Sequence, residues 1–448
     1  MRNTKTIFFF AFIQQVIKVG QKKPKRKKPG DRTEENRSQI DKGTESDESS
    51  VVLTEGQKSM RRVIIYVSLL AVLLTAWGGY NLFLYSKRET LADKCEAFKT
   101  RGEWASLELT AREWAQWEPD NVKPWIYAAA AAQEVGNAEK ELAYLNSMPE
   151  GAPFAALLRR SDLQFQRNFV KDAEKSFVEL VELEPQSKEA HRRLNFFYAM
   201  TRQRNELISE SRRAIENGAD VPETYVYLVG ADWMTFTNGW QVNLEWAQKY
   251  PDDSEVFEVA SALHLISAGV DQSMEEQDAK LKEALSQSEN LIKNLRLKYP
   301  ANKEIILLDL MYNVHRANAR EVGEILNSVD IEIDDSRYHR VIGWFHSYKE
   351  DWVEAEKSYL KCLELNPFDW QARHEYSAVL RSLKRTEEVK VMQEAAALGK
   401  DIMRKVLQAE NTITIPRSTL QQVIDYATAC GETEIATSLS NRINPNVE

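Results

Sequence analysis

The residues most able to carry chemistry in this chain of 448 residues are its six histidines. His339 and His346 stand seven positions apart, so on a helix they would lie on one face, two turns from each other. Two such imidazoles could share a metal ion, but a protein metal site usually needs a third ligand, and the pattern offers none. We therefore interpret both histidines as structural and predict no metal site.

Paired acidic residues are a second arrangement that can do acid–base chemistry. Three pairs fall at expected helix ends and turns, where carboxylates usually cap helices or face solvent; they are Glu182 and Glu184, Asp252 and Asp253, and Asp334 and Asp335. No glycine-rich phosphate loop, H-E-x-x-H motif or G-x-S-x-G motif is present. The three cysteines, Cys95, Cys362 and Cys430, are too far apart for a zinc site or a disulfide framework. The sequence predicts no catalytic residue, no cofactor and no enzyme activity.

Aromatic residues raise the alternative of a receptor that binds a small ligand or a glycan. Four of the eleven tryptophans fall close together, at Trp104, Trp114, Trp117 and Trp125. Aromatic side chains at helical spacing more often pack in a core than bind a ligand. An aromatic-lined cavity with convergent polar groups would favour the receptor, whereas a flat charged groove would favour peptide binding.

The elements that must position these residues are helices arranged as hairpins. Ala355, Tyr359 and Cys362 are three or four residues apart and share a helix face, and Pro367 ends that helix because it lacks an N–H group. Upstream, Gly343 lies among larger residues of a second helix, where a small side chain lets the two helices approach. The pattern predicts a helical hairpin of about 34 residues.

This hairpin resembles a tetratricopeptide repeat, whose pattern is W-x2-L-G-x2-Y, then A-x3-F, then P. Here the pattern reads His339-x2-Ile342-Gly343-x2-His346, then Ala355-x3-Tyr359, then Pro367. The first half recurs from Trp125, His191, Phe257 and Arg373, and the second half recurs as Ala173-x3-Phe177. Pro119, Pro185 and Pro251 are 66 residues apart, and Pro300 and Pro367 are 67 apart, which is twice the repeat length.

The resemblance implies an all-α fold, a right-handed superhelical solenoid of helix-turn-helix repeats. We expect about nine hairpins over residues 89–400 and C-terminal capping helices over residues 401–448. Three places depart from the pattern: Gly269–Leu281, where a longer helix or an inserted loop is expected, Thr235–Trp240, and Thr412–Pro416.

One stretch predicts a single transmembrane helix within residues 61–88. Val63–Tyr85 is 23 residues without a charge, about 34 Å as a helix and enough to cross a hydrocarbon core of about 30 Å. Basic residues flank both ends, and Trp77, Tyr80 and Tyr85 gather near the second end, as aromatic residues do at a membrane interface. We expect the lipid bilayer to contact Val63–Tyr85.

The segment before this helix, residues 1–60, is expected to be basic and largely disordered. Residues 1–62 contain 15 Lys and Arg against 8 Asp and Glu, although the whole chain has a net charge of −9. This bias favours a cytoplasmic N-terminus and a periplasmic repeat domain at a bacterial inner membrane. The remaining chain is therefore acidic, which excludes it as a binder of nucleic acid.

The concave face of such a solenoid is lined mainly by the first helix of each repeat, and the resemblance implies that a partner binds there. Counting repeat positions gives seven candidate groove residues: Arg159, Arg192, Arg193, Phe196, Arg340, Trp344 and His374. The first three arginines would form a basic patch able to bind an acidic peptide or a C-terminal carboxylate. The alternative is that these arginines pair with glutamates of their own chain.

The sequence thus predicts a membrane-anchored scaffold for protein–protein interaction that presents a groove to a peptide or helix of a partner. Its layout is similar to bacterial inner-membrane repeat proteins of envelope or secretion-related assemblies. Two alternatives remain open: a small-ligand or glycan receptor, and a regulatory subunit of a membrane enzyme.

Overall fold

A computed structural model describes residues 55–270, 287–409 and 411–444 of the chain. The described residues form α-helices joined by short turns, with one turn of 3-10 helix. Two compact units meet within helix α2, one ending at Tyr80 and the other beginning at Asn81. Most of the segment expected to be basic and largely disordered, residues 1–54, lies outside the described residues.

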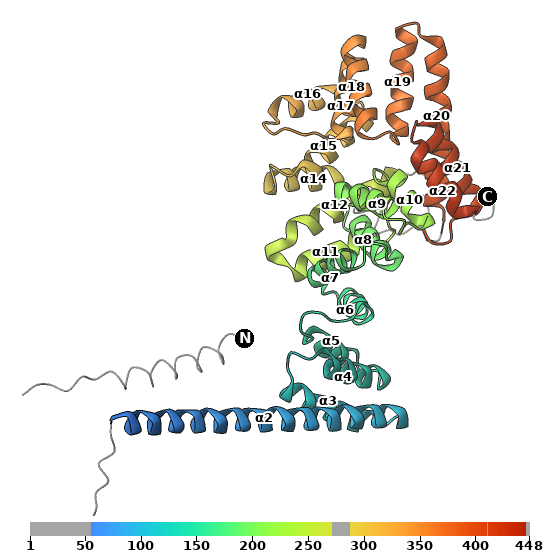
Figure 1. Cartoon of the computed structure of the whole chain (residues 1–448). Coiled ribbons are helices and arrows are strands. Elements are labelled where there is room, and N and C mark those ends of the chain that lie inside the picture. Colours follow the sequence, from blue (N-terminus) through green and yellow to red (C-terminus); the bar gives the residue numbers. More distant parts are fainter. Residues whose placement is uncertain (1–54, 271–286, 410, 445–448) are drawn as a thin grey trace, which may run out of the picture. The chain divides into compact units, whose positions relative to one another are not determined.

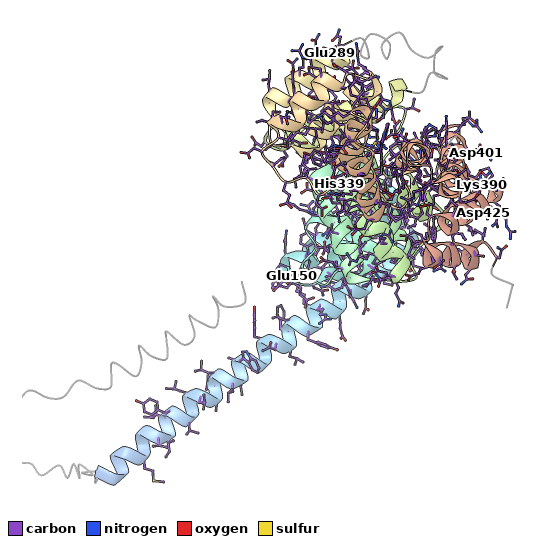
Figure 2. All side chains as sticks on the ribbon, turned by 90° about the horizontal axis from the view of Figure 1, so that it is seen from above. Glu150, Glu289, His339, Lys390, Asp401 and Asp425 are labelled. Carbon is purple, nitrogen blue, oxygen red and sulfur yellow. The ribbon has the colours of Figure 1, made fainter. Side chains whose placement is uncertain are left out.

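Helix α2 spans Glu55–Arg101, 47 residues without interruption (Figure 1). It begins at Glu55, so the last residues of the segment expected to be disordered are helical. Within the first unit, the side chains from Val63 to Tyr80 are exposed, and Figure 2 shows side chains projecting from this helix along its length. From Val63 onward α2 is long and apolar enough to cross a membrane, by length and composition.

Among the described residues, the helices of the second unit follow one another along the chain as the first and second helices of successive repeats. Their first helices are the C-terminal part of α2, α4 (Val122–Glu134), α6 (Phe154–Gln166), α8 (Lys188–Met200), α10 (Pro222–Gly230), α12 (Ser254–Val270), α15 (Lys303–His315), α17 (Ser336–Tyr348), α19 (Trp370–Ser382) and α21 (Arg417–Ala429). Their second helices are α3 (Trp104–Trp117), α5 (Ala138–Asn146), α7 (Val170–Leu183), α9 (Arg204–Glu216), α11 (Gly239–Lys249), α14 (Ser288–Lys298), α16 (Ala319–Ser328), α18 (Trp352–Leu365), α20 (Thr386–Leu407) and α22 (Thr433–Ile443). This stack confirms the all-α, tetratricopeptide-like fold.

The five regularly spaced prolines all have the same place in this stack. Each stands two residues beyond the last residue of a second helix: Pro119 after α3, Pro185 after α7, Pro251 after α11, Pro300 after α14 and Pro367 after α18. A proline there cannot continue the helix, because its ring fixes φ and its nitrogen carries no hydrogen. The regular spacing of these prolines therefore marks the ends of hairpins.

The turn inside most hairpins uses one residue in the left-handed region of the backbone. Gly136 (φ 72°) ends α4 in this way, and Glu350 (φ 60°) and Ala317 (φ 51°) do so after α17 and α15. Such a residue closes the last turn of a helix, and glycine adopts it without steric cost. Ala317 and Glu350 adopt it with a Cβ atom, which makes these turns strained.

Packing between α17 and α18 explains the residue pattern of this repeat. Ala355, Tyr359 and Cys362 are each at most 1% exposed. A Cβ atom on Gly343 would lie 3.0 Å from the Tyr359 ring, which explains the small residue between the two helices. Asp335 caps α17 by accepting a hydrogen bond from the Arg337 N–H group at 2.9 Å.

The three expected departures fall where helix lengths change. Helix α10 ends early at Gly230, and α11 begins at Gly239, so Thr235–Trp240 lies mostly in the connection. Helix α12 has 17 residues, and the rest of the expected insertion, residues 271–286, lies outside the described residues. Thr412–Pro416 lies between α20 and α21.

The C-terminal hairpin contacts the middle of the stack as well as its own neighbour. Helices α21 and α22 both pack against α10, far back along the chain (Figure 1). The hydroxyl groups of Tyr225 on α10 and Ser438 on α22 share a hydrogen bond of 2.8 Å, and Tyr227 contacts Thr412 at 3.1 Å. An open solenoid contacts only successive repeats, so this array closes on itself over α10–α22.

Candidate binding cavity

The closed part of the stack contains a cavity of about 360 Å³ that is open on one side. It is lined mostly by first helices of hairpins, α12, α15, α17 and α19, together with the residues after α10 and the end of α20. The lining residues are Asp232, Trp233, Ile266, Ser267, Leu308, Met311, Tyr312, His315, Arg316, Arg337, Arg340, Phe368, Asp369, Trp370, Gln371, Met403 and Leu407. The cavity thus brings together residues from both ends of the closed segment.

Large apolar side chains form most of the lining, and the turn before α19 supplies two of them. Phe368 is held by its N–H group, which donates to the Asn366 side chain at 3.1 Å, and by its carbonyl, which accepts from the Tyr426 hydroxyl at 2.8 Å. Trp370 begins α19. Apolar walls of this kind gain free energy by covering an apolar group.

Arg340 and Asp369 are the polar pair of the lining. Arg340 is 8% exposed and donates through Nη1 to both oxygens of Asp369, at 3.0 and 3.1 Å. Asp369 also caps α19 by accepting from the Ala372 N–H group at 2.8 Å. Burial alone would lower the pKa of Arg340, but the nearby acidic groups, Asp369 first among them, together more than offset it, so the pKa is raised and the guanidinium stays charged.

The second terminal nitrogen of Arg340 has a weaker partner. Nη2 donates to the thioether sulfur of Met311 at 3.4 Å. Sulfur is a poor acceptor for a guanidinium, so this donor gains free energy from any better acceptor that enters the cavity.

Arg337, which also lines the cavity, anchors a buried ionic cluster. It is 2% exposed and donates to both oxygens of Glu304 at 2.8 and 2.7 Å and to both oxygens of Asp335 at 2.9 and 2.8 Å. Asp335 is buried, which would raise its pKa, but Arg337 holds that pKa well below its usual range. The Asp335 carboxylate is therefore ionised, and Arg337 is held by carboxylates from two hairpins.

Arg204, on α9, joins this cluster to the earlier hairpins. Its Nη2 donates to Ser336 at 2.8 Å, and its Nε pairs with Asp232. Asp232 also accepts from Asn366 at 2.7 Å. Arg202 lies nearby, and burial together with the charge of Arg337 lowers its pKa to about 10. The cluster thus ties residues 202–232 to residues 336–366.

Glu375 lies behind this site, on α19. Its carboxylate accepts a hydrogen bond from the Tyr359 hydroxyl at 3.1 Å. Burial raises the pKa of Glu375 to about 7, while the charge of Arg340 acts in the opposite direction. The state of this carboxyl group is therefore sensitive to pH near neutrality.

The exposed side of the cavity carries His315 and Arg316, at the end of α15. Arg316 donates from Nη1 to the Tyr312 hydroxyl at 2.9 Å, and its guanidinium lies 5.4 Å from the centre of the Tyr312 ring. Within the part of the chain that the structure describes, Arg316 forms no ion pair with a carboxylate. It leaves a positive charge at the cavity opening.

Of the seven groove residues expected from the sequence, Arg340 lines this cavity. Trp344 lies one turn further along α17 and stacks on Tyr348, with ring centres 5.9 Å apart. His374 is exposed on α19. Neither Trp344 nor His374 belongs to the lining.

The other four lie on α6 and α8, away from the cavity lining. Each arginine pairs with a carboxylate of its own chain: Arg159 with Glu141 at 2.6 Å, Arg192 with Glu223 at 2.6 Å and Arg193 with Asp162 at 2.6 Å. Phe196 packs edge-on against Phe165 and Phe236, at 5.9 and 5.6 Å between ring centres. A peptide carboxylate would have to displace these internal partners, as the alternative expectation stated.

The two histidines of the α17 repeat have separate surroundings. His346 contacts the Asp351 carboxylate at 3.3 Å, and His339, labelled in Figure 2, has its ring 6.2 Å from that of Tyr338. Among the described residues no three His, Cys, Asp or Glu side chains converge as a metal site would require.

Sequence reasoning missed Arg337, Asp369 and Trp233. One signal was available: Asp335 and Asp369 stand one repeat apart, 34 residues, and each caps the first helix of a hairpin. A cap residue at the concave end of a hairpin can hold an arginine of its own or the preceding hairpin, as Asp335 holds Arg337 and Asp369 holds Arg340. No signal in the sequence indicated Trp233, whose position depends on the closed array.

Comparison with known proteins gives structural similarity alone. No protein-family model matches the chain, and no curated protein matches it. Similar solved structures include a tetratricopeptide repeat protein from Parabacteroides merdae, with 12% identity and a TM-score of 0.27 over 66% of this chain and 99% of that one. The P58(IPK) TPR domain has 16% identity and a TM-score of 0.23 over 67% and 99% of the two chains. Yeast Tom70 has 12% identity and a TM-score of 0.26 over 80% and 90%. At these TM-scores the similarity says nothing about a ligand or partner.

Proposed function

We propose that this protein is a membrane-anchored scaffold that binds a segment of a partner protein, with one bulky apolar side chain of that segment inserted in the cavity. The observation that carries the proposal is the cavity itself, in which aromatic and aliphatic walls surround the buried guanidinium of Arg340. Its volume of about 360 Å³ lies at the lower end of ligand sites, so it fits one large side chain.

The charges around the cavity define the rest of the partner segment. Arg340 has a donor that contacts only a thioether, and Arg316, which pairs with no carboxylate among the described residues, places a positive charge at the opening. Both favour a hydrogen-bond acceptor or an acidic group beside the apolar side chain. The other charged groups are held in ion pairs with each other, which supports binding rather than catalysis.

A second candidate is a receptor for a small ligand. The recessed, aromatic-lined form of the cavity, with polar groups converging on it, favours this function over binding on a flat charged groove. The two candidates use the same residues, so they differ in whether the occupant belongs to a polypeptide.

Filling the cavity separates binding in it from binding elsewhere. Leu407→Trp adds bulk to the lining, whereas the control Val391→Trp adds the same side chain on the exposed face of the same helix, where Val391 is 55% exposed. The full chain is purified from membranes in detergent, and bound proteins and small molecules are identified by mass spectrometry. We expect a partner that copurifies with the wild type and the control to be lost with Leu407→Trp. Equal recovery from all three would overturn binding in the cavity, and loss of a small molecule alone would support the receptor.

For location, we propose a single pass through a bacterial inner membrane by Val63–Tyr85, in an envelope or secretion-related assembly. The exposed apolar side chains of α2 support the membrane span. The basic excess of residues 1–62 supports an N-terminus in the cytoplasm. Added protease should then degrade the helical stack in spheroplasts, where the periplasmic face is accessible. Protection of the stack in spheroplasts would reverse this orientation.

A further inference from the structure

The first hairpin places an exposed tryptophan beside the end of the uncharged stretch. Helix α3 runs back along α2, with Leu91 and Cys95 of α2 buried against Leu107 of α3. Trp117, at the C-terminal end of α3, therefore lies against Phe83, with ring centres 6.4 Å apart and planes at 73°. Trp117 and Phe83 are 34 residues apart in sequence.

Packing within the hairpin does not account for this tryptophan. Trp114, one turn earlier, is 1% exposed and donates its indole N–H to Glu118 at 2.8 Å, so it serves the core. Trp117 is 43% exposed, Phe83 beside it is 56% exposed, and Leu82, the residue before Phe83, is 70% exposed. A contiguous apolar surface thus extends from the end of the uncharged stretch onto α3.

Lys87 places a cation beside Trp117. The Lys87 ammonium is 3.6 Å from the centre of the Trp117 ring and 3.3 Å from the Glu113 carboxylate. Arg88 lies 3.8 Å from Glu118 in the same way. Because these charges are paired, the surface offers amphipathic side chains without a net positive charge.

We infer that Trp117 lies in the headgroup region of the phospholipid bilayer, beside Phe83, so that the first hairpin contacts the membrane surface directly. This inference rests on the proposed membrane anchor. Tryptophan favours the membrane interface because its ring is apolar and its N–H group can remain hydrated. The lysine stem can lie along the ring while its charge stays in water. The paired charges predict little dependence on anionic lipid.

The test measures tryptophan fluorescence of the full chain in phosphatidylcholine nanodiscs, with and without bromine on the acyl chains near the headgroup. Bromine quenches tryptophan at close range. The variants are Trp117→Phe, Trp77→Phe, which reports the uncharged stretch, and Trp104→Phe, a control at the other end of α3. We expect the quenchable fluorescence to fall in both Trp117→Phe and Trp77→Phe and to be unchanged in Trp104→Phe. Adding phosphatidylglycerol should leave the result the same.

Each other result has one meaning. Quenching lost with Trp77→Phe but unchanged with Trp117→Phe would keep the anchor and overturn the contact of the hairpin with lipid. Trp117 protected from both bromine and aqueous acrylamide would assign this surface to a second copy or a protein partner instead. A chain that does not embed in the nanodiscs would overturn the anchor, and this inference with it.

Discussion

Arg442 holds Asp220 through two hydrogen bonds of 2.8 and 2.7 Å, although 222 residues separate them. The Asp220 side chain is fully buried and also accepts from the Tyr225 hydroxyl at 2.7 Å. This closing contact joins α22 to the turn before α10. The residues that follow α10, Asp232 and Trp233, line one side of the cavity, so the closing contact supports the cavity from outside it.

Arg442→Ala should weaken the closed array. It leaves the buried Asp220 carboxylate without its cation, which costs about 1–3 kcal/mol after allowance for the partial exposure of Arg442. The expected results are a lower melting temperature and faster amide hydrogen exchange in α21 and α22. The control Arg404→Ala breaks the exposed pair with Asp401 and should cost about 0.5 kcal/mol or less. Unchanged exchange in α22 would show that the contact does not hold the array closed.

Gly399 should tolerate no side chain, although it lies inside helix α20. A Cβ atom there would lie 2.5 Å from Trp370 Cβ and 2.8 Å from the Tyr426 ring. We expect Gly399→Ala to destabilise the fold by about 1–3 kcal/mol through overpacking, although alanine favours an exposed helix by about 1 kcal/mol. Chemical denaturation measures the change, with the exposed Gln393→Ala as a control of near-zero effect. A more stable Gly399→Ala would contradict the close approach of α19, α20 and α21.

Because the turn at Ala317 is strained, replacing alanine by glycine should have opposite effects on stability at Ala317 and at Ala378. Its φ of 51° costs about 1–2 kcal/mol for a residue with a Cβ atom, so Ala317→Gly should stabilise the fold by about 0.5 kcal/mol after the added flexibility of the unfolded chain. The same change at Ala378, exposed inside α19, should destabilise by about 1 kcal/mol. Thermal unfolding of both variants measures the two shifts, and shifts of the same sign would contradict the left-handed turn.

Glu375 should make the fold less stable as the pH rises toward neutrality. Its pKa in the folded state is raised to about 7 from its ordinary value of 4.5, so the folded state binds the extra proton. Its stabilising contribution is complete below about pH 4.5 and is lost as the pH rises through 7. Glu375→Gln, which resembles the protonated form, should remove this loss.

The comparison with wild type is needed because His264 acts in the opposite direction. Burial lowers the pKa of His264 to about 3, so its contribution is present above pH 6.5 and decreases as the pH falls below it. The difference in unfolding free energy between wild type and Glu375→Gln, measured from pH 5 to 8, isolates the carboxyl group. The exposed Glu364→Gln is the control for loss of one negative charge elsewhere on the surface. A flat difference for Glu375→Gln would mean that Glu375 is ionised throughout.

The sequence was a good guide to the hairpins because their causes are local. Pro367 ends α18, and Gly343 admits the Tyr359 ring, and both effects involve neighbours within one repeat. The packing of α21 and α22 against α10 depends on small rotations that accumulate over many hairpins, so no single residue predicts it. The cavity depends on the same accumulated rotations. For this reason the sequence did not indicate Trp233, and Arg340 is the one expected groove residue that lines the cavity. Arg192 was placed correctly on α8, but its partner Glu223 lies on the next hairpin, at a distance that repeat counting does not give.

The most direct test of the account uses photo-methionine incorporated by living cells, followed by illumination and mass spectrometry of the crosslinked peptides. Met311 and Met403 line the cavity, and photo-methionine keeps nearly the size of methionine, so the cavity stays open. The account predicts crosslinks from these two positions to a peptide of another protein, lost in Leu407→Trp and kept in Val391→Trp. Crosslinks from Met311 and Met403 only within the chain, or only to a small molecule, would contradict the binding of a partner segment.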